Sequence, residues 1–104
     1  MTTYENPYAL FKYPIDPDDT EVRGGGTILS SLSVGVVGGK AFLWAIADKE
    51  PRDRGSLPVG SPRIAIVATG ADVPLWVGKQ NFIGRLQFDG TVIGTLQFHV
   101  FVSR

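Results

Sequence analysis

The sequence predicts an all-β fold, a small antiparallel barrel or sandwich of six to seven short strands. Three observations support this. Apolar and polar residues alternate with a period of two. Glycine and proline, 13 and 7 of 104 residues, separate the apolar runs. No segment carries an apolar stripe at helical spacing. The length suits one domain over residues 1–104, with a single core.

The first predicted elements are short. Residues 9–13 and 20–23 are weak strands, and Pro14 is expected to end the first of them. Residues 16–21 are the best helical candidate. They contain Pro17 and are mostly acidic, so we expect one turn at most.

The most regular pattern lies on both sides of a Gly-Gly pair. Residues 27–37 alternate between apolar and small or polar, whereas residues 40–47 are apolar on both faces. Gly38 and Gly39 supply the positive φ that a tight hairpin turn requires. We therefore predict a hairpin of 27–37 with 40–47, whose second strand is central in its sheet.

The C-terminal half predicts three further strands. Residues 63–69 are rich in β-branched side chains, and residues 82–88 and 91–102 flank Asp89-Gly90, a strong hairpin signal. Alternation assigns the following residues to the core: Ile28, Leu32, Val34, Val36, Leu43, Ile64, Ile66, Leu86, Leu96, Phe98, Val100 and Val102.

Two loops are long for so short a chain. Residues 48–62 are polar, rich in proline and glycine, and carry interleaved acidic and basic side chains, which is typical of a mobile arm. Residues 70–81 carry the apolar triplet Leu75-Trp76-Val77, which we expect to be buried against another surface. Either they mediate self-association, or the segment is an Ω-loop whose Trp76 covers one end of the barrel.

The composition excludes several classes of function. The chain has no cysteine and one histidine, which excludes a disulfide scaffold, a thiol nucleophile and a Cys-based or multi-His metal site. The zero net charge argues against general nucleic-acid binding. The apolar runs are too short to cross a membrane, and the N-terminal residues do not resemble a signal peptide. We therefore expect a cytosolic protein without a membrane partner.

Catalytic motifs are incomplete. A serine triad would need His99, but the serines of residues 30–33 lie on a predicted strand and not at a nucleophile elbow. Glycoside chemistry needs two facing carboxylates, and Glu21 is the one acid within the strand interiors. We therefore predict a binding protein with no catalytic residue, metal or cofactor, and not an enzyme.

The candidate ligand-binding residues are polar or aromatic groups on strands, at strand ends and in the long loops. They are Trp44, Asp48, Thr69, Gly70, Trp76, Arg85 and His99. An arginine guanidinium binds phosphate or carboxylate bidentately, so the expected ligand is a small anion, for example a nucleotide. Structural alternatives stay open: Trp44 in the core, Arg85 on a solvated face, and His99 hydrogen-bonded within its strand.

Several short motifs occur in the order found in one family. They are FKYPI at 11–15, FLWAIAD at 42–48, ATG at 68–70 with Pro74, Ile83-Gly84, and FHVF at 98–101. Over residues 11–101 the chain resembles a widespread group of small, uncharacterised bacteriophage proteins with the pattern W-K-Y-P-L, L-W-A-L-V-D-P, G-T-G-x-x-x-P, Y-I-G-T-F and W-H-V-F. It departs from that pattern at Phe11, Ala47, Lys49, Ala68, Arg85 and Phe98.

The resemblance implies a phage origin and three functional hypotheses. The first is a homo-oligomeric accessory protein in the host cytoplasm that sequesters a small anionic ligand, such as a nucleotide immune signal, as a counter-defence sponge. The second is a structural or decoration protein of the virion. The third is a protein inhibitor of a host enzyme that uses the arm at residues 48–62.

Overall fold

The structure is a computed structural model and describes residues 7–49, 61–91 and 94–103. These residues form six strands and one short 3-10 turn: β1 (Tyr8–Ile15), β2 (Ile28–Val37), β3 (Lys40–Asp48), β4 (Ile64–Ala68), η1 (Lys79–Asn81), β5 (Phe82–Thr91) and β6 (Gly94–Val102).

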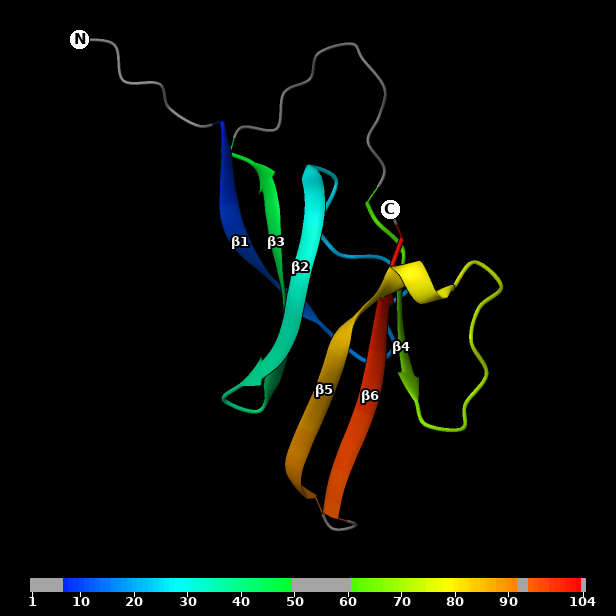
Figure 1. The fold of residues 1–104 in the computed structure, drawn as a ribbon. Coiled ribbons are helices and arrows are strands. Elements are labelled where there is room, and N and C mark those ends of the chain that lie inside the picture. Colours follow the sequence, from blue (N-terminus) through cyan, green and yellow to red (C-terminus); the bar gives the residue numbers. More distant parts are fainter. Residues whose placement is uncertain (1–6, 50–60, 92–93, 104) are drawn as a thin grey trace, which may run out of the picture.

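The strands form two antiparallel sheets of three strands each (Figure 1). One has the order β1-β3-β2 and the other β4-β6-β5; we call them the β3 sheet and the β6 sheet after their central strands. The sheets meet where β2 packs beside β5, and no ladder of hydrogen bonds joins them within the described residues. The predicted all-β fold is confirmed, as a small sandwich that does not close into a barrel.

The predicted hairpin around the Gly-Gly pair is confirmed. Gly38 and Gly39 have φ values of 59° and 77°, and β2 pairs with β3 on either side of them. Positive φ at both central residues matches the right-handed twist of the flanking strands. β3 is central, as predicted, and alternates buried alanines and Leu43 with half-buried larger side chains.

The predictions for residues 9–13 and 20–23 need correction. β1 continues through Pro14 to Ile15, because β1 is an edge strand and a proline there leaves no ladder hydrogen bond unmade. Residues 20–23 form no strand: a single bridge joins Glu21 to Arg63, and a turn follows in which the N–H of Gly25 donates to the carbonyl of Val22 at 3.0 Å.

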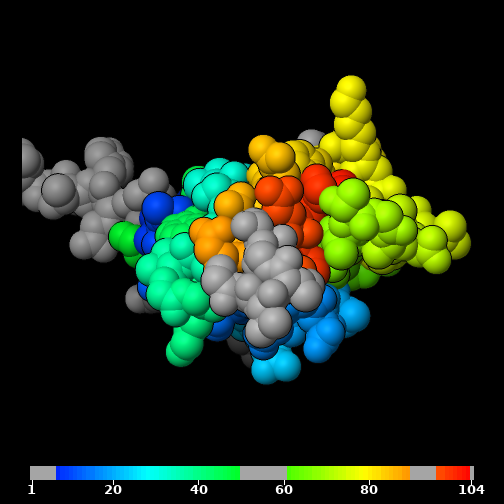
Figure 2. All heavy atoms as spheres, turned by 90° about the horizontal axis from the view of Figure 1, so that it is seen from below, coloured from blue at the N-terminus to red at the C-terminus, as the bar shows by residue number. Residues whose placement is uncertain are grey.

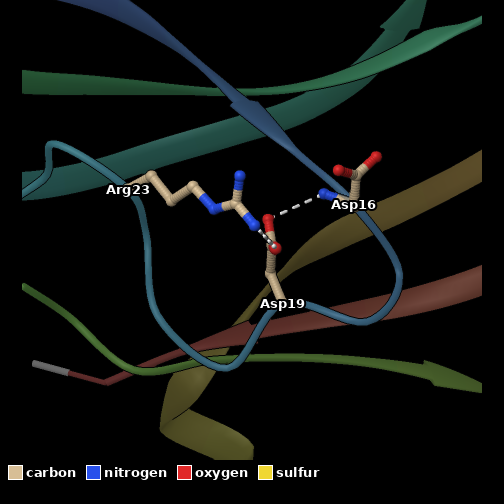
Figure 3. A network of polar contacts seen from close by, with 3 residues as sticks. All are labelled: Asp16, Asp19 and Arg23. Carbon is tan, nitrogen blue, oxygen red and sulfur yellow. Dashed lines mark hydrogen bonds and ion pairs between the residues drawn. The ribbon is translucent and has the colours of Figure 1, made fainter.

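The connection after β1 is a hydrogen-bonded turn, not a helix (Figure 3). The N–H of Asp16 donates to Oδ2 of Asp19 at 2.8 Å, and the N–H of Asp19 donates back to the carbonyl of Asp16 at 2.9 Å. Arg23 Nη2 lies 3.9 Å from Oδ1 of Asp19. The two reciprocal hydrogen bonds fix the path of the chain as it leaves the β3 sheet.

The assignment of Leu32 to the core is wrong. Its side chain is 49% exposed. The register between β2 and β3 shifts between Ser31 and Ser33, so Leu32 is the extra residue of a β-bulge. A bulge interrupts the period of two that the alternation assumed, and it turns the side chain of this residue away from the core.

The predicted turn at Asp89-Gly90 is also displaced. β5 runs on to Thr91, which pairs with Gly94 of β6, so the chain does not reverse direction at Asp89-Gly90. The register shifts between Phe88 and Thr91, which places Asp89-Gly90 at an irregularity within the strand. Glycine is favoured at such bulges for the reason that favours it in turns, its freedom in φ.

The core lies between the two sheets. Its largest fully buried side chains are Leu43, Leu86, Val22 and Val100. Val22 comes from the loop after β1, and its N–H donates to the carbonyl of Pro62 at 3.0 Å. The remaining predicted core residues other than Leu32 are buried or half-buried, whereas the buried Ile15 and Val22 were not predicted.

Most of the predicted arm at 48–62 lies outside the described residues. The described part of the chain contains no helical segment with the length and hydropathy that crossing a bilayer requires.

Candidate functional site

The β6 sheet has two chemically different faces. Leu86, Val100 and Val102 point into the core and are at most 2% exposed. The residues between them alternate onto the opposite side. We call this side the outer face; its residues are Ala65, Val67, Phe82, Arg85, Gln87, Gln97, His99 and Phe101. Ala65, opposite Phe101, is buried, so the face is covered at that point.

Arg85 and His99 lie side by side on the outer face. They are Cα partners across β5 and β6, and Val67 of β4 is the partner of His99 on its other side. Side chains of directly opposed residues lie about 5 Å apart at their Cβ atoms. Arg85 is exposed and His99 half-buried. A guanidinium side chain and an imidazole side chain therefore start from adjacent positions on the sheet.

Two phenylalanine rings adjoin this pair. The ring centroids of Phe82 and Phe101 are 5.7 Å apart in an edge-on arrangement, and those of Phe82 and His99 are 6.1 Å apart. Phe82 is 46% exposed, although it touches both neighbours. Partly exposed rings on a sheet surface offer π-faces on which a planar group can stack.

Two side-chain amides lie on the other side of Arg85 and His99. Nε2 of Gln97 donates to Oε1 of Gln87 at 3.4 Å, and Nε2 of Gln87 donates to Oδ1 of Asp89 at 3.2 Å. Both glutamines are exposed. The amides hold each other in place and keep further donor and acceptor capacity for a ligand.

A groove begins where the aromatic end of the outer face stops. It has a volume of about 570 Å³ and lies along the first half of β2, between Leu29, Leu32 and the start of β5. Phe82 and Ile83 line it on the β5 side. Phe82 also lies 6.1 Å from His99, measured between ring centroids, so the groove and the outer face share this side chain.

This surface combines the groups that recognise a small anion carrying an aromatic ring. Arg85 can bind a phosphate or carboxylate through two parallel N–H donors. The Phe82 ring can stack on a planar base, and the glutamine amides and His99 can bond its polar edge. No described feature of the outer face resembles a nucleophile activated by a base.

Of the predicted ligand-binding residues, the structure brings together Arg85 and His99. Trp44 and Asp48 belong to the β3 sheet. The ring of Trp44 covers Gly35 on the sheet surface, where a Cβ added to the glycine would lie 3.2 Å from Cζ3 of the tryptophan. Asp48 ends β3, and its N–H donates to the carbonyl of Thr27 at 3.1 Å.

Thr69, Gly70 and Trp76 lie in the segment after β4. Thr69 and Gly70 form an exposed turn, with φ of 90° at Gly70. Trp76 packs under the guanidinium of Arg63, whose Cζ lies 5.2 Å from the ring centroid. Trp76 and Val77 are half-buried, whereas Leu75 is fully exposed, so the apolar triplet does not act as one surface.

Four residues of the outer face were not predicted as site residues: Phe82, Phe101, Gln87 and Gln97. The alternation on β6 already placed Gln97, His99 and Phe101 on one face. Phe82 could not be added, because a register shift between Phe82 and Gly84 reverses the face on which it lies. That shift is a property of strand pairing, and no local pattern in residues 82–88 signals it.

The described residues contain no group of three or more histidine and acidic side chains that could hold a metal ion. Comparison of the chain with protein-family models, curated proteins and solved structures gives no match.

Proposed function

We propose that this protein binds a small anionic ligand of the nucleotide class on the outer face of the β6 sheet, without catalysing a reaction. The proposal rests chiefly on one observation. Arg85 lies directly opposite His99, and the ring of His99 lies 6.1 Å from the exposed ring of Phe82, on a sheet face that points away from the core.

Each group has a distinct role. Arg85 pairs with the phosphate, because a charge-assisted and bidentate contact is the strongest that this face offers. Phe82 stacks on the base, and the adjoining groove receives the part of the ligand that extends beyond the ring. Gln87 and Gln97 hydrogen-bond the polar edge of the base. The neutral net charge fits a small ligand better than a long polyanion.

The resemblance to phage proteins extends this proposal to a biological role. We infer that the protein acts in the host cytoplasm as a counter-defence sponge, which lowers the free concentration of a nucleotide immune signal by binding it. Such a role requires that the protein binds the signal tightly and is present in sufficient amount, and it requires no catalytic turnover.

Calorimetric titration with a panel of ribonucleotides and cyclic dinucleotides tests the proposed site. We expect at least one of them to bind, and Arg85→Ala to weaken that binding by about 1.5–3 kcal/mol, the contribution of a charge-assisted hydrogen bond. Arg85→Lys keeps the charge but loses the two parallel N–H donors of the planar guanidinium. Its affinity should therefore lie between those of the parent protein and Arg85→Ala. Phe82→Ala removes the stacking surface and should cost about 1–3 kcal/mol.

Arg23→Ala is the matched control. Arg23 is also an exposed arginine, but it lies in the loop after β1 and pairs with Asp19. Its replacement should leave the affinity unchanged. If Arg85→Ala binds as tightly as the parent protein, or if Arg23→Ala is equally damaging, Arg85 does not form the site.

A further inference from the structure

The segment between β4 and η1 presents an apolar side chain entirely to solvent. Leu75 is 106% exposed, and Val73 beside it is 50% exposed. Isolated exposed leucines are common. This one differs in standing at the tip of a loop whose backbone is anchored on both sides of it. We call Leu75 with its neighbour Pro74 the knob.

The knob is held on a rigid support. The N–H of Val77 donates to the carbonyl of Pro74 at 3.0 Å, which closes a turn around Leu75. On one side Trp76 is fixed under Arg63. On the other side the buried Asn81 accepts from the N–H of Gly78 at 2.8 Å and donates to the carbonyl of Val102 at 3.2 Å. Little conformational entropy remains to be lost when the knob is buried.

An apolar pocket lies at the end of the sandwich where β1 ends and β3 begins. Its volume is about 550 Å³. The apolar part of its lining is Pro14, Ile15, Pro17, Ala41, Phe88, Leu96 and Phe98, and Asp16 and Lys40 add one acidic and one basic residue. Phe88 and Phe98 meet edge to face, with centroids 6.0 Å apart.

The wall of the pocket is also held in place by a hydrogen bond. Asp16 is fixed by its backbone hydrogen bond to the Asp19 carboxylate (Figure 3). Within the described residues, no ion pair engages the side chains of Asp16 or Lys40. Figure 2 looks at this end of the molecule: the β2–β3 turn lies on one side of the view and the loop that carries the knob projects from the other.

We propose that the knob of one copy of this chain inserts into the pocket of a second copy. The side chain of Leu75 is fully exposed, and no described residue of its loop lines the pocket. A volume of about 550 Å³ accommodates Leu75 together with Pro74. Asp72 and Lys79 are exposed and stand on either side of Leu75 in the sequence, and Lys40 and Asp16 line the pocket, so each of the two segments carries one charge of each sign.

The knob and the pocket are different surfaces, so the contact is heterologous. Each copy offers one knob and one pocket, and repetition of the contact gives a ring if the rotation closes and a chain if it does not. The inference is independent of the ligand site, because neither Leu75 nor any pocket residue belongs to the outer face.

Light scattering of single variants is the first test. We expect the parent protein to be larger than its monomer mass of 11.2 kDa at micromolar concentration. Leu75→Asp should weaken self-association at least about tenfold, as loss of an anchor residue does. The control is Leu10→Asp, which places the same change on a leucine that is 60% exposed on β1, and it should assemble as the parent does.

Mixing two monomeric variants is the decisive test. Ala41→Met fills the pocket with a flexible side chain and leaves the knob intact, whereas Leu75→Asp leaves the pocket intact. Each alone should be monomeric, and their mixture should give a dimer with one copy of each and no larger species. Lys40→Glu is a second pocket variant at an exposed position, in case Ala41→Met disturbs the core.

Two results overturn the inference. One is a parent protein that stays monomeric at micromolar concentration. The other is a mixture of folded Leu75→Asp and pocket variants that forms no dimer. Circular dichroism establishes that each variant is folded before its oligomeric state is compared with that of the parent protein.

Discussion

The side chain of Val34 on β2 lies against the backbone of Gly84 on β5. A Cβ added to Gly84 would stand 3.2 Å from Cγ2 of Val34, closer than ordinary van der Waals contact. This is a point where the two sheets meet, so the absence of a side chain at Gly84 sets how closely β2 and β5 approach.

Gly84→Ala should therefore lower the free energy of unfolding by about 1–3 kcal/mol, the usual cost of overpacking a core. In a Val34→Ala background the added methyl group has room, so the same substitution should cost clearly less. Urea denaturation of the four members of this cycle measures the coupling. Equal costs in both backgrounds would contradict the assigned contact.

Phe98→Ala should lower the free energy of unfolding by about 3–5 kcal/mol, as removal of a packed ring does. Phe98 packs against the core and meets Phe88 edge to face, with centroids 6.0 Å apart. Phe101→Ala, on the outer face of the same strand, is the control and should cost less. An unfolding midpoint unchanged by Phe98→Ala would mean that the faces of β6 are assigned the wrong way round.

Asn81 should prove important for the loop that carries Leu75. It is the one buried polar residue in the described part of the chain, and it bonds Gly78 and Val102. Asn81→Ala leaves that N–H and that carbonyl without their partner and should cost about 1–3 kcal/mol. Asn81→Asp keeps the acceptor for Gly78 but loses the donor to Val102. Hydrogen exchange of the Gly78 amide should accelerate in the alanine variant and much less in the aspartate variant; equal exchange would refute this role.

The strands and turns were predictable where the conformation or burial of a residue follows from its own type and its immediate neighbours. Gly38-Gly39 specified a turn, and the apolar run after it specified a central strand, because both follow from the conformation or burial of the residues themselves. Leu32 and Asp89-Gly90 were misassigned because each lies at a register shift. A shift depends on how two strands pair, and pairing is not encoded in the alternation of either one.

The site was predictable in part for the same reason. Arg85 and His99 were both candidates from their chemistry, but their adjacency depends on the pairing of β5 with β6. Trp44 and Asp48 were grouped with them as polar or aromatic residues on strands or at strand ends, and the structure assigns them to the other sheet. Phe82 joins the site through a bulge that its own segment does not reveal.

We propose that the outer face holds a small anionic ligand through Arg85, and native mass spectrometry can detect such a ligand on the intact protein. The samples are parent protein and Arg85→Ala purified from cells mounting a phage-defence response. We expect the parent to carry a bound small molecule of nucleotide composition, and Arg85→Ala, equally folded, to carry none. A parent protein with no bound molecule, or an Arg85→Ala variant that retains the same one, would contradict it.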